Sequence, residues 1–355
     1  MERRRGVTVL GVNPLAAGAV AIMVAALFIL PPLYGQFLPQ RLQDYLIFSL
    51  PALAVGLIAG HARLLNIGVG ATFGVAAYTV AILSQHTVNP VVLMLAALAA
   101  GSLVSALFAV YAVVATGLEY LLLTLLTTSA FFSLPLLSTS LTGGENGLGV
   151  QGAVTISFGL DPLNGNGFYW LLCAITVFWC GLSWYLLSSR LGHVMVAIGR
   201  NPVRAAAMGY SVRAYQIAVT MYSGVMAASG GWLYALAHAF VFEELLGLAN
   251  SINAVLYSLV GGVDTIVGPL IGTAGLRFLT EILGTVTTQT QLYVGIALLV
   301  VVYLLPGGVV GLLRQLWHLY RLQRRRARGE QVETIGEAMA EEVVLDRLFE
   351  GTADE

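Results

Sequence analysis

The chain has 355 residues, of which 58% are hydrophobic and only 10% are charged, and its formal net charge is −1. This composition lies far outside the range of soluble globular domains and indicates a polytopic membrane protein. The chain contains no lysine, so its basic side chains are arginines and histidines. Because a P-loop nucleotide site requires a lysine on the phosphates, the sequence excludes this type of ATPase within the chain.

Apolar segments that are long enough to cross a bilayer recur along the chain and predict about ten transmembrane helices. They are Pro14–Leu33, Tyr45–Gly60, Leu64–Leu83, Val91–Ala115, Tyr120–Leu137, Phe168–Leu187, Tyr215–Phe240, Ile252–Val263, Ile266–Leu283 and Leu292–Leu313. We expect the first to be retained, because its apolar run is too long for a signal peptide. Ile252–Val263 is short for a full crossing and is predicted to be bent or re-entrant. The predicted fold is an all-α polytopic membrane protein.

The arginines test this topology independently of hydropathy. With an even number of crossings, most of them fall on one side of the membrane, in the clusters Arg3–Arg5, Arg63, Arg190–Arg213 and Arg314–Arg328. By the positive-inside rule this side is cytoplasmic, so both termini are expected in the cytosol and loop 139–167 outside. We expect a transmembrane domain over 1–313 and a cytoplasmic tail over 314–355 that is first basic and then acidic.

The polar loop 189–213 carries the signals of one very short helix. Asn201 suits the N-cap, Pro202 suits the first helical position, and Gly209 is placed to end the helix in a left-handed conformation. About two helical turns are unstable alone in water, so the segment must be ordered by what it packs on. Two interpretations stay open: a solvated loop whose arginines only set the orientation, and a docking element for a partner protein.

Two glycine-rich stretches are candidates for the translocation path or its gate. Gly70 and Gly74 share one helical face, which favours helix packing, whereas Asn66 needs a polar partner and is a candidate for lining a polar path. In the outward loop Leu141–Leu148, the glycines permit close backbone approach, which suits either solute or protein binding or a tight structural turn. The candidate residues are Asn66, Gly68, Gly70, Thr142, Gly143, Gly144, Asn146 and Gly147.

Charges inside the membrane are few. Arg277 and Glu281 lie four residues apart on one predicted helix, so we expect them to form a structural ion pair with each other. No chain of acidic and histidine residues indicates a proton relay, and no histidine pair has the spacing of a helical metal site. The basic patch Arg321–Arg328 directly follows a membrane span, which favours lipid anchoring over nucleic-acid binding.

Five stretches, in order over roughly residues 46–311, together resemble the M-type permease of branched-chain amino-acid (LIV-type) ABC importers. They are Leu64-Leu-Asn66-Ile-Gly68, Leu141-Thr-Gly-Gly-Glu-Asn-Gly-Leu148, Ser189-Arg-Leu-Gly192, Asn201-Pro-Val-Arg-Ala-Ala-Ala-Met-Gly-Tyr210 and Gly261-Gly262 with Gly268-Pro269. The resemblance implies a sister H-type permease, two cytosolic ABC ATPases that bind the ATP, an extracytoplasmic solute-binding protein, and the plasma membrane of a prokaryote, which is the inner membrane in a Gram-negative cell. It also implies that the short helix is the coupling helix, with contacts from Arg200, Asn201, Pro202, Arg204, Ala206 and Gly209.

The sequence therefore predicts a transport subunit without cofactor or catalytic residues, which moves a branched-chain amino acid or a related small polar solute inward. The alternative is an ATP-independent channel or secondary carrier for a small solute such as urea or an amide. In that alternative, loop 189–213 would be only a connector.

Overall fold

The computed structural model describes residues 37–115, 117–152, 157, 160, 166–286, 289–304 and 307–312. The expected first crossing Pro14–Leu33, part of loop 139–167 and the tail 314–355 lie outside these residues. By its internal contacts the chain divides into a unit over 1–310 and a second unit over 311–355. All helices and strands described below belong to the first unit.

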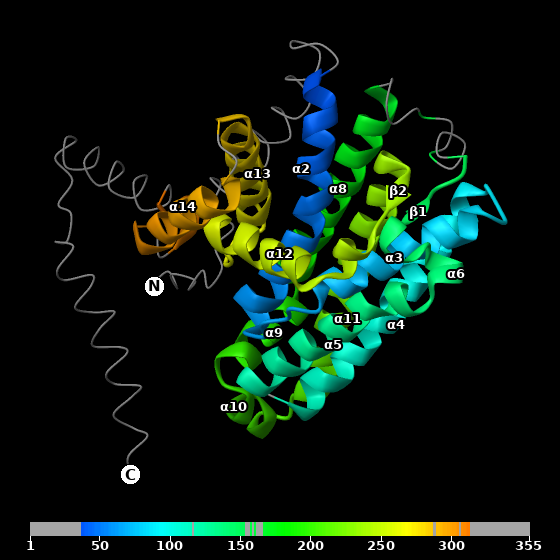
Figure 1. Ribbon diagram of the computed structural model, residues 1–355. Helices are drawn as coiled ribbons and strands as arrows, with labels where there is room; N and C mark the ends of the chain where they lie inside the picture. The colour runs from blue at the N-terminus through cyan, green and yellow to red at the C-terminus, as the bar shows by residue number, and fades with distance from the viewer. Residues whose placement is uncertain are drawn as a thin grey trace. The chain divides into compact units, whose positions relative to one another are not determined.

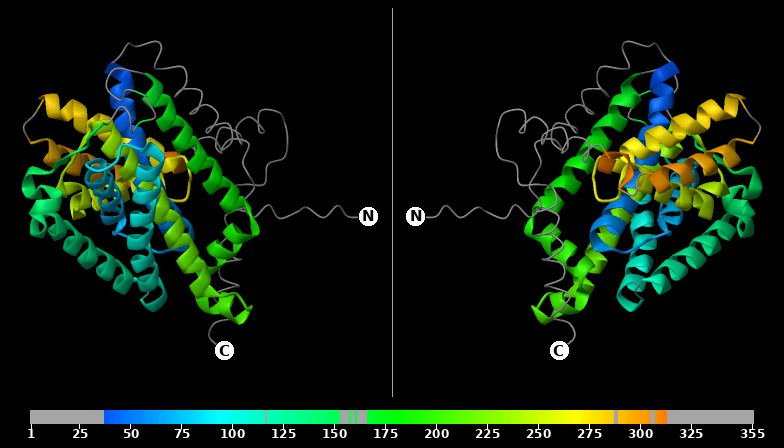
Figure 2. Two further views of the ribbon diagram at one scale, coloured as in Figure 1. Left: turned by 90° about the vertical axis from the view of Figure 1, so that its right-hand side faces the viewer. Right: turned by 90° about the vertical axis from the view of Figure 1, so that its left-hand side faces the viewer.

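The described chain is helical apart from short connections (Figures 1 and 2), which confirms the all-α polytopic class. The elements are α2 (Phe37–Leu57), the π-helical turn η1 (Ile58–Ala62), α3 (Val69–Ser84), α4 (Pro90–Val114), α5 (Leu118–Leu137), α6 (Thr139–Thr142), η2 (Gly144–Asn146), β1 (Leu148–Gly149), α8 (Asn166–Ser188), α9 (Arg190–Arg200), α10 (Pro202–Ala207), α11 (Val212–His238), β2 (Phe240–Val241), η3 (Glu243–Leu246), α12 (Leu248–Gly261), α13 (Gly268–Val286) and α14 (Thr290–Leu304).

Four helices of the described chain are long and apolar enough to cross a membrane. They are Arg41–Ala62, which joins α2 to η1, and Pro90–Val114, Leu118–Leu137 and Gly167–Ser188. Helices α3 and α12 are apolar but shorter, while α11 is longer, with 27 residues, and carries many small and polar side chains. The figure of about ten crossings therefore stays a prediction.

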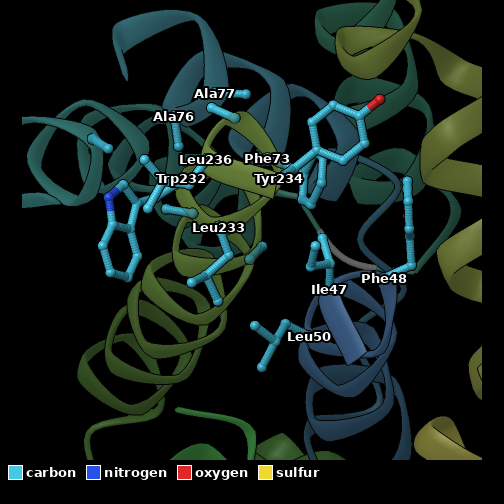
Figure 3. Packing of buried hydrophobic residues seen from close by; sticks show 14 of the residues in the cluster. Ile47, Phe48, Leu50, Phe73, Ala76, Ala77, Trp232, Leu233, Tyr234 and Leu236 are labelled. Carbon is cyan, nitrogen blue, oxygen red and sulfur yellow. The ribbon is translucent and has the colours of Figure 1, made fainter. Parts of the chain in front are cut away.

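The core lies where α2, α3 and α11 meet (Figure 3). Helix α3 contains no charged residue and is buried on nearly every side, as expected for a helix that is apolar all round. The Phe73 ring lies 5.6 Å from the Phe48 ring and 5.7 Å from the Tyr234 ring, measured between centroids. These aromatic contacts join one residue from each of the three helices.

Small residues allow α11 to approach its neighbours closely. A Cβ atom at Gly231 would lie 2.0 Å from the Phe73 carbonyl oxygen of α3, and one at Gly101 of α4 would lie 2.3 Å from the Ala228 Cβ of α11. Lipid tails are as apolar as a leucine side chain, so the hydrophobic effect does not drive helices together within a membrane. Close van der Waals packing holds such helices together instead. Larger side chains at these positions would separate the central helices.

Several predicted helix boundaries were wrong. Helix α2 begins at Phe37 rather than at residue 45, and α12 begins at Leu248 rather than at residue 252. Helix α3 begins at Val69 rather than at residue 64, because residues 63–68 are not helical, and hydropathy alone does not detect a break in an apolar run. Helix α14 ends at Leu304 rather than at 313. Pro306 follows shortly after in the sequence and lacks the N–H group that a helix interior requires.

Candidate functional site

The short helix α10 forms as the capping residues predict. The Asn201 side chain accepts a hydrogen bond from the Arg204 N–H at 2.9 Å, and Pro202 occupies the first helical turn. Gly209 has a φ of +88° just past the helix end, where only a residue without a Cβ is unstrained. Local chemistry therefore determines both ends of this six-residue helix.

Most of the surface of helix α10 is exposed. Within it only Ala205 is buried, while Val203 is 78% exposed and Met208, at its C-terminal cap, is 60% exposed. Among the described residues, neither Arg200 nor Arg204 has an acidic partner within ion-pair distance. Exposed apolar side chains beside unpaired cations are typical of a surface that binds another protein.

Helix α9 precedes α10 and was missed by the sequence analysis, which assigned this stretch to a polar loop. It buries Gly192, Met195 and Ile198, and this spacing of three residues is the signal that would have revealed the helix. A Cβ atom at Gly199 would lie 2.6 Å from the His61 carbonyl oxygen, so α9 lies directly against η1. The α9–α10 pair is thus connected to the end of the long span α2–η1.

Residues 63–68 interrupt the helical path between η1 and α3. The Asn66 side-chain oxygen accepts a hydrogen bond from the Gly68 N–H at 2.7 Å. The Ile67 N–H donates to the Thr124 hydroxyl at 3.3 Å, and the Ile67 carbonyl accepts from the Thr128 hydroxyl at 3.2 Å. Two hydroxyls of α5 therefore satisfy backbone groups that a helix would otherwise pair, as the interior of a membrane protein requires.

The first turns of the short helices α3 and α12 meet beside this interruption. The Gly70 N–H donates to the Ser251 hydroxyl at 2.9 Å. A Cβ atom at Gly70 would lie 2.4 Å from the Ser251 hydroxyl oxygen, and one at Gly74 would lie 2.5 Å from the Leu246 side chain. Both glycines therefore allow close helix packing. Interrupted helices that meet in this way are a feature of transport sites. A path role for Asn66, Gly68 and Gly70 stays a prediction.

The stretch Thr142–Gly147 forms a compact turn that ends in a strand. The Thr142 hydroxyl lies 2.7 Å from the Pro135 carbonyl oxygen and is not free for a solute. Gly143 has a φ of +78°, and a Cβ atom there would lie 2.0 Å from the carbonyl oxygen of Gly147. Gly147 itself has a φ of +67°, and a Cβ atom there would lie 2.4 Å from the carbonyl oxygen of Val241. This geometry favours a structural turn for the glycines.

The strand after this turn links it to the end of α11. Leu148 of β1 pairs with Val241 of β2, antiparallel, and Gly149 pairs with Phe240. Glu145 and Asn146 are exposed at the tip of the turn. The turn and α10 therefore lie at opposite ends of α11, since β2 follows its last residue and α10 precedes its first. A role of Gly144 and Asn146 in solute or protein binding stays a prediction.

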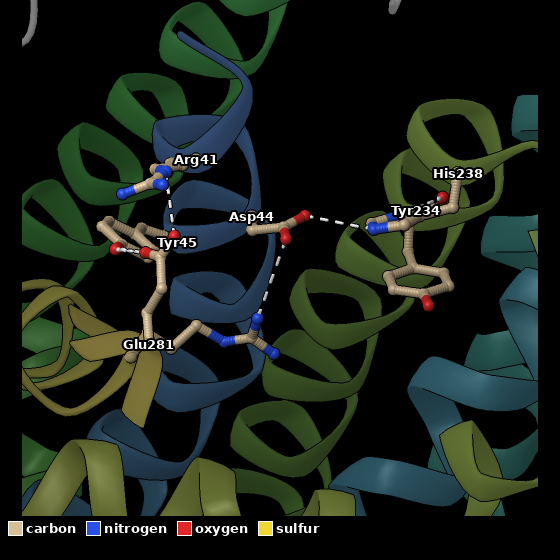
Figure 4. A network of polar contacts seen from close by, with 7 residues as sticks. Arg41, Asp44, Tyr45, Tyr234, His238 and Glu281 are labelled. Carbon is tan, nitrogen blue, oxygen red and sulfur yellow. Dashed lines mark hydrogen bonds and ion pairs between the residues drawn. The ribbon is translucent and has the colours of Figure 1, made fainter. Parts of the chain in front are cut away.

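The expected ion pair between Arg277 and Glu281 is wrong, because each residue has a partner on α2 instead (Figure 4). The Arg41 Nε lies 2.8 Å from a Glu281 carboxylate oxygen, and the Tyr45 hydroxyl donates to the same carboxylate at 2.9 Å. The Arg277 guanidinium lies 3.9 Å from the Asp44 carboxylate. Arg41 precedes the predicted span Tyr45–Gly60 but lies within α2, where one helical face brings these residues toward α13.

The same network extends to α11. Asp44 also contacts His238, with 3.2 Å between the ring nitrogen and the carboxylate, and the His238 ring stacks on Tyr234. The guanidinium carbon of Arg277 lies 3.5 Å from the centroid of the Phe48 ring. The charges thus join α2, α11 and α13 at the end of the bundle away from α10 (Figures 1 and 2). Within the described part of the chain, no three metal-ligating side chains gather into a metal site.

Comparison with known proteins agrees with this architecture. A family model described as "Branched-chain amino acid transport system / permease component" matches residues 41–305. The high-affinity branched-chain amino acid transport system permease protein LivM of Escherichia coli (strain K12) is 25% identical over 318 residues, which cover 81% of this chain and 72% of that protein. The nucleoside ABC transporter permease protein NupC of Lactococcus lactis subsp. cremoris (strain MG1363) is 33% identical over 99 residues, 24% of this chain and 31% of that protein. No solved structure matches.

Proposed function

Because the chain belongs to the family of permease components of branched-chain amino acid transport systems, we propose that it is the membrane-spanning permease subunit of an ATP-driven importer. The multi-pass helical fold and the family agree on a membrane transport protein. The proposed cargo is a branched-chain amino acid or a related small polar solute. The chain forms half of the translocation pathway, and an H-type sister permease supplies the other half.

The exposed, doubly capped helix α10 carries this proposal. The chain contains no lysine for a P-loop, so the energy of ATP must reach it through contact with separate ATPase subunits. Helix α10 suits that contact. Its caps keep this short helix folded, while nearly all of its side chains remain exposed. ATP binding closes the two ATPases against each other. Helix α10 has one position in each of the two states of the membrane domain, and the closed ATPases bind one of these positions more tightly. ATP binding therefore moves α10 to that position.

The remaining partners follow from the two ends of the bundle. The end with α10 faces the cytosol of a prokaryotic cell, where the ATPases are found. The opposite end, with the turn Thr142–Gly147, faces outward and receives solute from an extracytoplasmic binding protein. The exposed side chains of Glu145 and Asn146 support this assignment, since both are polar and free to contact a protein.

Replacing Ala206 with Asp tests the coupling contact. Ala206 is exposed, so the substitution leaves the permease fold intact while it places a charge in the ATPase interface. An unpaired charge buried at a contact costs about 3–5 kcal/mol, which lowers the affinity by more than about 100-fold. We expect co-purification of the ATPases and solute uptake to be lost together, while membrane abundance is unchanged.

The matched control is Ala206→Ser, which changes the same position without adding a charge. This variant should retain both ATPase binding and uptake. If Ala206→Asp also retained both, α10 would be a connector, and an ATP-independent channel or carrier would become the better description of the protein.

A further inference from the structure

A cavity of about 360 Å³ that opens to the surface lies between the end of α2–η1 and α12 with the turn that follows it, and Arg63 and Asp264 are exposed at its mouth. Its volume falls in the range of sites that hold small molecules. Most of its wall is aliphatic, from Val55, Leu65, Val255, Leu259 and Val263. Helix α9 contacts η1 at His61 and Ala62, next to the η1 residues that line the cavity, so the cavity lies at the end of the bundle that carries the coupling helix.

Two opposite charges line this cavity without being paired. Arg63 follows η1, and Asp264 lies in the turn between α12 and α13. Within the described residues neither side chain has an ion-pair partner, and they do not bond to each other. From the sequence, Arg63 was only a marker of membrane orientation. The tertiary structure places both charges in the wall of one cavity.

One further feature marks the same wall as a candidate ligand site, and it lies in the backbone. Arg63 has a φ of +57°, a left-handed conformation that is uncommon for a residue with a side chain. Its N–H bonds to the Ile58 carbonyl, which holds this conformation at the end of η1. Backbone strain of this kind is found preferentially at ligand sites.

Resting on the proposed function, we propose that this cavity is the solute site and that it binds an aliphatic α-amino acid as the zwitterion. The Arg63 guanidinium binds the carboxylate, the Asp264 carboxylate binds the ammonium group, and the aliphatic wall holds the side chain. A zwitterion supplies one partner for each unpaired charge, and charge-assisted hydrogen bonds of this type are the strong ones. A nucleoside is uncharged and would leave both charges unpaired as it displaced their water.

The position of the cavity also explains how the site is emptied. Because α9 lies against η1 at Gly199, a displacement of α10 by the ATPases shifts the wall that carries Arg63 relative to the turn that carries Asp264. A zwitterion bridges both charges and loses one contact when they separate. The affinity for the amino acid therefore depends on the position of the coupling helix.

Binding of radiolabelled L-leucine to the purified full-length permease tests the assignment. Arg63→Asn removes the guanidinium with a residue that tolerates the left-handed conformation, and Asp264→Asn removes the charge at constant shape. Each should weaken leucine binding about tenfold or more, as expected for the loss of a charged hydrogen bond. The controls Arg213→Asn and Glu119→Gln remove exposed charges outside the cavity wall and should leave the affinity unchanged.

Two leucine analogues keep the test valid if a variant fails to fold. 4-Methylpentanoate lacks the ammonium group and 3-methylbutylamine lacks the carboxylate, and both should compete weakly with leucine on the wild-type protein. Arg63→Asn should abolish competition by the acid only, and Asp264→Asn competition by the amine only. Unchanged leucine affinity in both folded variants would overturn the proposal, as would absence of leucine binding or competition by uridine but by neither analogue. Any of these results would concern only the solute site. The proposed coupling to the ATPases would still stand if Ala206→Asp released the ATPases.

Discussion

The contact between α9 and η1 can be perturbed with a single methyl group. Ordinary contact begins at 3.4 Å, and the Cβ of Gly199→Ala would lie 2.6 Å from the His61 carbonyl oxygen, so the two helices must separate by about 0.8 Å. Overpacking of this kind costs about 1–3 kcal/mol, which exceeds the gain of about 0.5–1 kcal/mol from replacing a helical glycine. We therefore expect a small net loss of stability and a displaced η1.

The function of this contact is measured as the number of ATP molecules hydrolysed per solute transported in reconstituted vesicles. Gly199→Ala should retain ATPase binding, because α10 is untouched, while uptake falls and the coupling ratio rises. Gly181→Ala in α8 is the matched control, since a Cβ there meets nothing within 4 Å and should leave uptake unchanged. A wild-type coupling ratio in Gly199→Ala would refute the idea that α10 acts on the bundle through η1.

Two further predictions concern the core and the turn Thr142–Gly147. Phe73→Ala removes a fully buried ring that packs on two other aromatic rings. It should destabilise the protein by about 3 kcal/mol, the low end for such changes, because lipid removes much of the hydrophobic term. Phe178→Ala, at a ring that is 59% exposed, should change the unfolding free energy in a detergent titration by much less, and equal effects would contradict the packing argument. Gly143→Ala should lower membrane abundance, measured by immunoblot, because its Cβ would lie 2.0 Å from the Gly147 oxygen, whereas Asn146→Ala at the exposed tip should keep abundance and reduce uptake. Normal abundance of Gly143→Ala would show that the turn is not required for folding.

The features that the sequence determines by itself depend on neighbours along the chain. The all-α membrane class follows from composition, and the ends of α10 follow from Asn201, Pro202 and Gly209, whose capping bonds span at most a few residues. Such local signals are present before any tertiary contact forms. The missed helix α9 belongs to this group as well, because its buried residues repeat at helical spacing.

Tertiary structure decides the features that depend on which helices become neighbours. Arg277 and Glu281 are close enough in sequence to pair, yet α13 packs against α2, and partners there are better placed than a residue one turn away. The break at residues 63–68 is stabilised by two hydroxyls of α5 that bond to the backbone of Ile67. Arg63 and Asp264 share a cavity because α2 and α12 pack together. Hydropathy and spacing describe one helix at a time, whereas pairing of distant charges depends on the distances between helices, which only packing sets.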